Sequence, residues 1–313
     1  MSRPRVYVTR KVPGEGLDLL KEKCTVSMWD SDEPVPKEEL LNQVKGVHAI
    51  FCTISDRIDA AVLNAAGSNL KIVATMSVGR DHISVQECES RDIYVANTPD
   101  VASDSAADLT VALLLMTTRR LVEGLEAVRA GEWGPWKPAW ICGMELMNKT
   151  VGIFGFGRVG FGVARRLRPF GVSDILYNDP YEAGHAKGLA KYVSFDELLS
   201  KSDVLCICCA VTPQTIGMFN KKTFQKMKKT SFLINTARGA IVNHDDLYDA
   251  LKNGDIGAAG LDVTTPEPLR SDHPLIKLNN CIILPHMGTN TVEARHSMSV
   301  NTAKNIIAML GLD

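Results

Sequence analysis

The stretch TVGIFGFGRVGFGVARRL, residues 150–167, places three glycines between an apolar strand and the start of a helix. The glycines stand at 155, 157 and 160, which is the G-x-G-x-x-G spacing of a loop that holds a dinucleotide. In such a loop Gly155 permits a tight turn, Gly157 lets the backbone approach a pyrophosphate, and Gly160 allows close packing of helix on strand. Because the required strand and amphipathic helix flank the glycines, the stretch predicts a dinucleotide-binding βα unit.

The next apolar run, ILYND, ends at Asp179, nineteen residues after Gly160. A carboxylate at this position accepts hydrogen bonds from the adenosine ribose hydroxyls and repels a 2′-phosphate. The phosphates themselves would meet the amides at the N-terminus of the helix, where the helix dipole favours negative charge. The sequence therefore favours NAD over NADP as the cofactor.

The rest of the chain repeats the alternation of short apolar runs with helical segments. After residue 150 the runs are TVGIFGFG, ILYND, VLCICC, FLINT, GAAGLDV and CIILPH, and before it they are RVYV, HAIFCT, LKIVATM and IYVAN. Such alternation is typical of parallel βαβ units, and 313 residues suffice for about two domains of roughly 150 residues. We expect an α/β protein with two doubly wound parallel-sheet domains, and a last helix near 292–309 that folds back on the first.

A different pattern separates the two series of strands. One long helical stretch is expected at about 103–130, and it is followed by GEWGPWKPAWICG, residues 131–143. The glycines and prolines of this second segment exclude a regular helix or a central strand. Its three tryptophans fit either a packed surface loop or an arm buried against a second subunit. Composition alone leaves both alternatives open.

Charge and hydropathy restrict the partners of the chain. With 35 basic and 36 acidic side chains the net charge is -1, which gives no sign of binding to nucleic acid or to an anionic membrane. The longest apolar run, VALLLM at 111–116, is far shorter than the ~20 residues that span a bilayer. The N-terminal MSRPRVYVTR lacks the apolar core of a signal peptide. We expect a cytoplasmic protein that binds small molecules or a second copy of itself.

Eight cysteines are spread over the chain, and three of them lie in LCICCAV, residues 205–211. This segment is typical of a buried strand, on which Cys206 and Cys208 would share one face. Metal ligation is one alternative, but no histidine or second cysteine pair stands nearby in the sequence. Reduced cysteines that pack as small hydrophobic side chains, with no metal, are the favoured interpretation.

Three ionisable residues end or follow predicted strands of the second series. They are Arg238 after FLINT, Glu267 after GLDVTT and His286 after CIIL. Taken singly, the arginine suits an interdomain salt bridge, the glutamate a solvated loop and the histidine a place in the core. However, a doubly wound sheet binds its ligands at the carboxyl ends of its strands. The convergence of the three residues on strand ends therefore favours a catalytic site.

The three residue types suit the transfer of hydride to a carbonyl group. His286 would be the acid that protonates the developing alkoxide, because histidine ordinarily titrates near neutral pH. A nearby carboxylate would keep the imidazole protonated, and we favour Glu267 over Asp262 for that partner. Arg238 would hold a carboxylate of the substrate.

The segments NTARGAIV, GLDVTTPEP and ILPHMG, together with the glycine loop, resemble the D-2-hydroxyacid dehydrogenase family over essentially the whole chain. WGPWKPAWICG and NTPDV are similar to its glyoxylate/hydroxypyruvate reductase branch. The resemblance implies NAD(P)H-dependent reduction of small 2-oxo acids, glyoxylate to glycolate and hydroxypyruvate to D-glycerate. It also implies a substrate-binding domain at 1–101 and 288–313, and an NAD(P)-binding Rossmann domain at 102–287 that includes a dimerisation arm.

The resemblance assigns roles to individual residues. Arg238 would hold the substrate's carboxylate and carbonyl oxygen, His286 would donate the proton, and Glu267 would pair with His286. The implied substrate contacts, besides Arg238, are Ile54, Ser55, the amides of Val78 and Gly79, and Trp140, which would reach into the neighbouring subunit of a homodimer. The implied cofactor contacts are Gly155, Gly157, Arg158, Val159, Gly160, Asp179, Thr212, Pro213, Thr236, Ala237, Asp262 and Gly288.

Two positions depart from the family pattern. Ala106 stands where many relatives have a threonine that contacts the cofactor. Members of the branch that prefer NADPH have a basic or glycine-containing turn where this chain has NDP, so the cofactor preference should follow Asp179. Two alternative functions are a short-form phosphoglycerate dehydrogenase and a dinucleotide-sensing, corepressor-like interaction protein. The second would be expected to carry partner-binding tails, for which this chain leaves little room.

Overall fold

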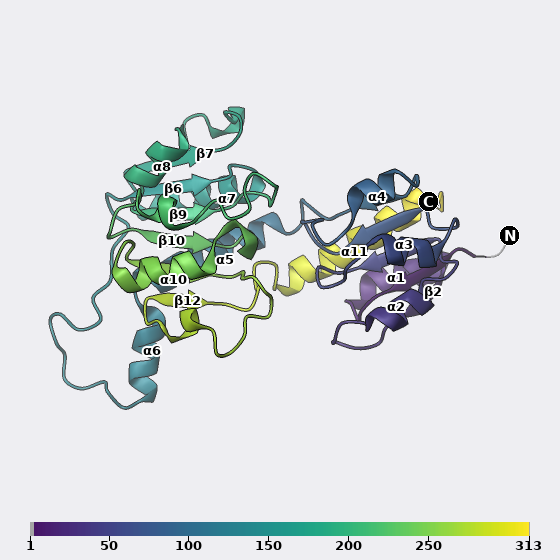
Figure 1. The fold of residues 1–313 in the computed structure, drawn as a ribbon, viewed down its shortest axis with the longest axis horizontal. Coiled ribbons are helices and arrows are strands. Elements are labelled where there is room, and N and C mark those ends of the chain that lie inside the picture. Colours follow the sequence, from purple (N-terminus) through teal and green to yellow (C-terminus); the bar gives the residue numbers. More distant parts are fainter. Residues whose placement is uncertain (1–2, 313) are drawn as a thin grey trace. The chain divides into compact units, whose positions relative to one another are not determined.

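The computed structural model describes residues 3–312. Contacts between Cα atoms divide the chain into two compact units. The split unit combines Met1–Ala102 with Thr289–Asp313, and the central unit is Ser103–Gly288. Each unit contains a parallel sheet with helices on both of its faces (Figure 1). This arrangement confirms the predicted α/β class with two doubly wound sheets.

Within residues 3–312, the sheet of the split unit has five parallel strands in the order β2-β1-β3-β4-β5. The strands are β1 (Arg5–Val8), β2 (Thr25–Met28), β3 (Ala49–Cys52), β4 (Ile72–Thr75) and β5 (Tyr94–Ala96). One face is covered by α1 (Gly14–Lys23) and α11 (Val292–Met309). The other is covered by α2 (Lys37–Gln43), α3 (Ala60–Ala66) and α4 (Val85–Glu89).

Alternate side chains along the strands build one core on each face of this sheet. Val6 and Val8 of β1 pack in the cluster that includes α1 and α11, whereas Tyr7 packs in the cluster that includes α2, α3 and α4. On the neighbouring strand β3, Ile50 pairs with Tyr7 and packs in the same cluster. Because successive side chains point to opposite faces, a strand covered on both faces must be apolar throughout.

Helix α11 joins this unit through a close contact with α1. A Cβ on Gly16 would lie 2.4 Å from the hydroxyl oxygen of Ser299, so only glycine fits at this crossing. The Ser299 hydroxyl also donates a hydrogen bond to the carbonyl oxygen of Pro13, at 2.9 Å. The last helix of the chain is therefore an integral part of the split unit.

The sheet of the central unit has seven parallel strands within residues 103–288, in the order β12-β11-β10-β9-β6-β7-β8. They are β6 (Thr150–Phe154), β7 (Asp174–Asn178), β8 (Lys191–Tyr192), β9 (Val204–Ile207), β10 (Phe232–Asn235), β11 (Ala258–Leu261) and β12 (Cys281–Ile283). Strands after β7 and β8 are added on the other side of β6, so the order reverses between β6 and β9. Such a switch point is where a sheet of this kind binds its ligand.

Helices cover both faces of the central sheet. On one face lie α5 (Ser103–Thr118) and α7 (Arg158–Leu167), and on the other lie α8 (Phe195–Lys201), α9 (Lys221–Phe224) and α10 (His244–Asn253). Within β9, Val204 and Cys206 pack toward α5 and α7, whereas Leu205 and Ile207 pack toward the opposite face. Short 3-10 turns are η1 (Arg168–Phe170), η2 (Gly184–Ala186), η3 (Gly239–Ile241) and η4 (Pro274–Lys277).

The helical stretch expected at about 103–130 is confirmed, but it is not continuous. The stretch forms two helices, α5 and α6 (Leu121–Arg129), which are separated at Arg119 and Arg120. Arg120 has a φ of +54°, in the left-handed region, and this breaks the helical backbone. Its guanidinium donates two hydrogen bonds to the carboxylate of Glu123, at 2.7 and 2.8 Å, which hold the corner in place.

Four elements had no counterpart among the predicted segments: the strands β2 and β8 and the helices α2 and α9. Both strands lie at a sheet edge, and their side chains are partly or fully exposed. An edge strand with a solvated face needs no continuous apolar run, so it lacks the signal by which the inner strands are found. In α2, the only fully buried residue is Leu40.

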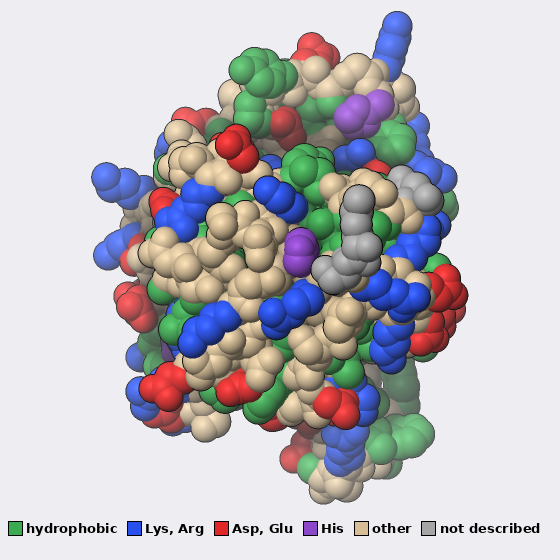
Figure 2. All heavy atoms as spheres, turned by 90° about the vertical axis from the view of Figure 1, so that its right-hand side faces the viewer, with side chains coloured by type: hydrophobic (Ala, Val, Ile, Leu, Met, Phe, Trp, Pro, Cys, Tyr) green, Lys and Arg blue, Asp and Glu red, His purple; other side chains and the backbone are tan. Residues whose placement is uncertain are grey.

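The surface of the split unit carries charges of both signs. In Figure 2, Lys and Arg side chains are scattered among Asp and Glu side chains over the face turned to the viewer.

None of the helices in residues 3–312 is both long and apolar enough to cross a membrane. All eight cysteines are free thiols, and burial raises the pKa of the Cys206 thiol to about 12.

Candidate active site

The three glycines of the loop between β6 and α7 lie in different surroundings. Gly155 has a φ of +92°, and a Cβ there would lie 2.5 Å from the Cα of Cys209. A Cβ on Gly160 would lie 2.2 Å from the carbonyl oxygen of Gly155. Gly157 is exposed, and a Cβ on it would meet no described atom within 4 Å. The fold itself thus requires the first and third glycines, whereas the second leaves its backbone open to a ligand.

Asp179 follows β7 and contacts the glycine loop directly. Its Oδ2 accepts a hydrogen bond of 2.6 Å from the amide of Phe156, which lies between Gly155 and Gly157. The side chain is half-buried. The carboxylate predicted to bind the ribose is thereby fixed beside the loop predicted to bind the pyrophosphate.

Four further residues predicted to contact the cofactor lie beside the switch point of the sheet. Arg158 and Val159 form the first turn of α7. Thr212 and Pro213 lie in an exposed turn after β9, where the Thr212 amide donates to the hydroxyl of Thr215 at 2.8 Å. All four therefore belong to loops or helix starts at the carboxyl ends of β6 and β9.

The predicted contact Thr236 is hydrogen-bonded across to α5. The hydroxyl of Thr110 donates to the carbonyl oxygen of Ala106 at 2.7 Å, and it lies 2.7 Å from the hydroxyl of Thr236. Because the Thr110 proton is already used, Thr236 must donate to Thr110 and keeps its own lone pairs for another donor. Ala106, which stands where many relatives have a threonine, thus lies one helical turn from Thr110.

Arg238 is held in a turn that sequence reasoning did not find. Asn235, the last residue of β10, is fully buried, and its side-chain amide accepts from the Ala237 nitrogen and donates to the Arg238 carbonyl, both at 3.0 Å. The guanidinium of Arg238 donates to the Ala237 carbonyl at 2.8 Å. In the sequence, the only sign of this role is that the apolar run FLINT changes to a polar residue at Asn235.

The turn after Arg238 packs tightly against the segment that carries Glu267. A Cβ on Gly239 would lie 2.1 Å from the carbonyl group of Thr264, so glycine is required there. The Thr264 amide in turn donates to Oε1 of Glu267 at 2.9 Å. Arg238 and Glu267 are thereby brought to the same part of the central unit.

His286 completes this group of charged side chains. Its Nδ1 lies 2.8 Å from Oε2 of Glu267. Burial raises the pKa of the Glu267 carboxyl, but hydrogen bonds from His286 and the Thr264 amide, with the charge of Arg238, outweigh it and hold the pKa below its usual value. An ionised carboxylate accepts the Nδ1 proton, which leaves Nε2 of His286 for a reacting molecule. The structure therefore brings Arg238, Glu267 and His286 together.

Asp262 holds the backbone of the loop that carries His286. Its carboxylate is buried, and the two oxygens accept the amides of Met287 at 2.6 Å and Gly288 at 2.8 Å. Its carbonyl accepts the His286 amide at 2.9 Å. His286 has a φ of +55°, a conformation that costs energy for a residue with a side chain and needs such support. Asp262 thus positions the loop, and Glu267 contacts the imidazole.

The residues predicted to bind the substrate from the first domain lie in two turns of the split unit. Ile54 and Ser55 follow β3, and the Ser55 hydroxyl accepts from Arg10 at 2.8 Å. Val78 and Gly79 follow β4, and Asn97 donates to the Val78 carbonyl at 2.6 Å. Neither the Val78 nor the Gly79 amide donates a hydrogen bond within residues 3–312.

Trp140 lies neither in the cluster of charged side chains around His286 nor in the two turns of the split unit. It stands in the irregular segment after α6. Its side chain is partly exposed, and Nζ of Lys137 stands 5.6 Å from its ring centre. Trp133 and Trp136 of the same segment are largely exposed. The segment is neither helix nor strand, as its glycines and prolines predicted.

Comparison with known proteins agrees with this geometry. Residues 111–288 match the family model described as the NAD binding domain of D-isomer specific 2-hydroxyacid dehydrogenases. The chain is 50% identical over 310 residues to the glyoxylate reductase/hydroxypyruvate reductase of Homo sapiens, covering 98% of this chain and 94% of that protein.

Solved structures extend the likeness to the whole fold. The TT0316 protein from Thermus thermophilus superposes with a TM-score of 0.92 at 39% identity, covering 98% of this chain and 97% of that one. The NADPH-dependent glyoxylate/hydroxypyruvate reductase of Sinorhizobium meliloti, in complex with NADP and malonate, gives a TM-score of 0.85 at 31% identity, with 99% and 94% covered. The chain therefore belongs to the D-isomer specific 2-hydroxyacid dehydrogenase family.

Proposed function

We propose that this protein reduces glyoxylate to glycolate and hydroxypyruvate to D-glycerate with a nicotinamide cofactor. The observation that carries the proposal is the contact of 2.8 Å between His286 Nδ1 and Glu267 Oε2, beside Arg238. This arrangement offers one proton donor and one cation for an anionic carbonyl substrate. The names of the human and bacterial relatives support the choice of substrates.

Each of the three residues has a separate task in the proposed reaction. The bound cofactor supplies the hydride. Arg238 binds the carboxylate and the carbonyl oxygen of the substrate through its planar set of N–H donors. His286 donates the Nε2 proton to the oxygen that becomes the hydroxyl group. Glu267 accepts the Nδ1 proton of the imidazole and so keeps the ring oriented with Nε2 toward the substrate.

The glycine loop and Asp179 fit a dinucleotide and favour NADH over NADPH. The exposed backbone at Gly157 leaves room for the pyrophosphate at the start of α7. Oδ2 of Asp179 is bound to the Phe156 amide, which leaves Oδ1 for the ribose hydroxyls. A 2′-phosphate would meet this fixed carboxylate as a like charge. The remaining residues proposed to contact the cofactor all follow the carboxyl ends of strands β6, β9, β10, β11 and β12 of the central sheet.

We propose that two turns of the split unit also contact the substrate. The amides of Val78 and Gly79 suit a carboxylate, because backbone N–H groups are good donors to anions. Ile54 and Ser55 offer one apolar and one hydroxyl contact from a second turn. These turns would thus contact the substrate, whereas the central unit would bind the cofactor and contribute Arg238 and His286.

A steady-state assay tests substrate and cofactor together. We expect NADH-dependent turnover of glyoxylate and hydroxypyruvate, with lower kcat/KM for a larger 2-oxo acid. At equal concentrations NADH should exceed NADPH in kcat/KM by at least about tenfold, which corresponds to ~1.4 kcal/mol of discrimination. A clear preference for NADPH would contradict the role of Asp179. Failure to reduce any of the three acids would favour the dinucleotide-sensing alternative.

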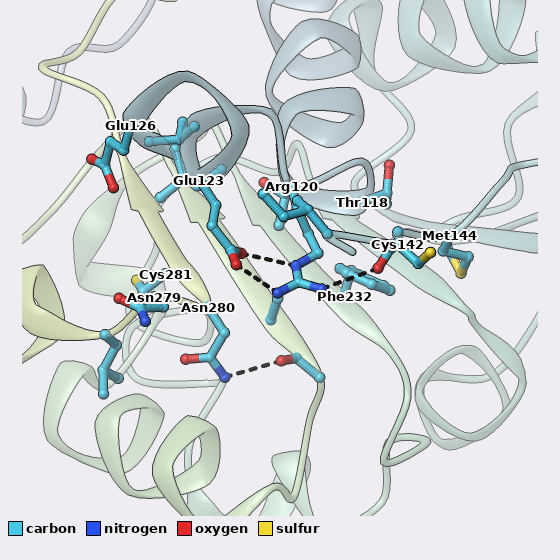
Figure 3. A pocket seen from close by; sticks show the side chains of 18 of the residues that line it. Thr118, Arg120, Glu123, Glu126, Cys142, Met144, Phe232, Asn279, Asn280 and Cys281 are labelled. Carbon is cyan, nitrogen blue, oxygen red and sulfur yellow. Dashed lines mark hydrogen bonds and ion pairs between the residues drawn. The ribbon is translucent and has the colours of Figure 1, made fainter. Parts of the chain in front are cut away.

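We also propose that α6 and the irregular segment after it, residues 131–143, pack against a second copy of the chain. Residues 131–143 are called the arm. Along α6, Leu121, Leu125 and Val128 expose about half of their surfaces and recur at helical spacing. Together with the neighbouring arm and the sheet, α6 borders a hollow of about 1310 Å³ (Figure 3). In that view Arg120 bridges from Glu123 to the Cys142 carbonyl, which ties the C-terminal end of the irregular segment to the start of α6. Such exposed apolar area is typical of a subunit interface.

The mass of the protein in solution tests the arm. We expect a species of twice 34.2 kDa in sedimentation or light scattering. Leu125→Glu should shift it toward the monomer, because a charge would be buried in the interface. Val292→Glu alters an exposed apolar residue outside the arm and should leave the dimer intact. Trp140→Ala should lower kcat/KM without dissociating the dimer. A monomeric wild-type protein would refute the arm.

A further inference from the structure

The backbone of Phe156, at the centre of the glycine loop, is hydrogen-bonded on both sides. Its amide donates to Oδ2 of Asp179 at 2.6 Å. Its carbonyl oxygen lies 3.0 Å from Nε2 of His185. Because a carbonyl oxygen only accepts, His185 must donate through a protonated Nε2. Asp179 was predicted from its spacing after the glycines, whereas His185 was not.

Aromatic contacts hold His185 in the position that this hydrogen bond needs. Its ring stacks on that of Phe156, with centres 5.8 Å apart and planes at 13°. The edge-on ring of Phe161, from α7, lies 5.2 Å away. The preceding residue but one, Ala183, donates its amide to the Tyr177 hydroxyl at 2.9 Å, which ties the loop to β7. His185 is therefore fixed in place although its side chain is exposed.

The position of this hydrogen bond determines the direction of the Gly157 amide. The carbonyl of Phe156 and the N–H of Gly157 belong to one planar peptide group, which is trans here. In a trans peptide group the C=O and N–H bonds point in opposite directions. Holding the carbonyl oxygen toward His185 therefore directs the Gly157 N–H to the other side of the loop. Gly157 is the one glycine of the loop whose surroundings are open.

We propose that His185 is a positioning residue for cofactor binding, which aims the Gly157 amide at the pyrophosphate by holding the Phe156 carbonyl. The inference rests on the proposed binding of a dinucleotide at the glycine loop. It adds a residue outside the glycine motif, contributed by the loop between β7 and β8. His185 itself needs no contact with the cofactor for this role.

Two substitutions separate the hydrogen bond from the ring contacts. His185→Phe keeps an aromatic ring beside Phe156 but removes the N–H donor, and His185→Gln keeps a side-chain N–H donor but removes the ring. Lys187→Ala, an exposed residue of the same loop, is the matched control. The dissociation constants of NADH and of ADP-ribose are measured by calorimetric titration, with adenosine, which lacks the pyrophosphate, as the comparison ligand.

We expect His185→Phe to weaken NADH and ADP-ribose about fivefold, the value of one ordinary hydrogen bond, and to leave adenosine unchanged. The KM for NADH should rise in step while kcat stays the same. His185→Gln should restore binding to within about twofold of wild type, because it returns a donor. Lys187→Ala should bind all three ligands as wild type does.

Three results would overturn the inference: unchanged NADH binding in His185→Phe, an equal loss of adenosine binding, or an equal loss in Lys187→Ala. The first would show that the hydrogen bond is not needed, and the other two that the whole loop had been disturbed. Failure of the proposed function shows elsewhere, as absent turnover or absent NADH binding in the wild-type protein. The two failures are therefore distinguishable.

Discussion

Replacing His286 with alanine is expected to lower kcat for glyoxylate and hydroxypyruvate by about two to four orders of magnitude, the usual contribution of a general acid. Without the imidazole, the developing alkoxide has to take its proton from water. The Glu267 carboxylate cannot replace it, because it contacts the ring at Nδ1, on the side away from the Nε2 that would serve the substrate oxygen. The dissociation constant of NADH should change little, since the substitution leaves the glycine loop intact.

Pre-steady-state and steady-state reduction assays measure this effect, with thermal unfolding as a check on the fold. The matched control is His296→Ala, which removes a histidine paired with Glu15 in the split unit. That variant should keep the wild-type kcat. Glu267→Gln should fall between wild type and His286→Ala, because the imidazole stays but loses its ionic partner. Near-normal turnover in His286→Ala would remove the histidine from the proposed mechanism.

Arg238→Ala is expected to damage the use of the substrate and to spare the cofactor. Loss of a charged partner from a hydrogen-bonded ion pair costs at least ~2 kcal/mol, or about 30-fold in kcat/KM for the 2-oxo acid. Lysine should recover only part of this, because it lacks the planar pair of donors that matches a carboxylate. The turn that carries Arg238 should survive, since Asn235 holds it through backbone atoms.

The substrate and cofactor readouts must be separated in this experiment. We expect the KM for glyoxylate to rise and kcat to fall, while NADH titration gives a wild-type dissociation constant. Arg270→Ala removes an exposed arginine, paired with Asp272, from the segment that follows Glu267. It should match wild type in both readouts. An Arg238→Ala variant that loses NADH binding as strongly as substrate turnover would place the arginine on the cofactor instead.

The sequence predicts the inner strands of both sheets and the three charged residues for one physical reason. Parallel strands buried on both faces are apolar throughout, so their ends are visible as abrupt changes to polar residues. Arg238, Glu267 and His286 each follow such a change, and strands of one parallel sheet carry their carboxyl ends at one edge. The ends of such strands can be located in the sequence without knowledge of any side-chain contact in the folded protein.

Other parts of the site depend on contacts that no pattern records. Asn235 and Asp262 act through hydrogen bonds to backbone amides, which become visible only when the turns are folded. His185 reaches Phe156 across 29 positions of the chain. The break between α5 and α6 depends on the left-handed conformation of Arg120, which helix propensity does not anticipate.

The hold of Asp262 on the loop after β12 has a mechanical consequence. The chain leaves the central unit after Gly288, only two residues beyond His286. Gly288, the residue before Thr289, is hydrogen-bonded on both sides. Its amide donates to Asp262, and its carbonyl oxygen accepts from the Ser105 hydroxyl at 3.0 Å. Ser105 itself lies just inside the other crossing between the units, at Ala102 and Ser103. The segments that enter and leave the central unit are thus joined by a hydrogen bond, and the backbone on the C-terminal side of His286 is anchored within the central unit itself.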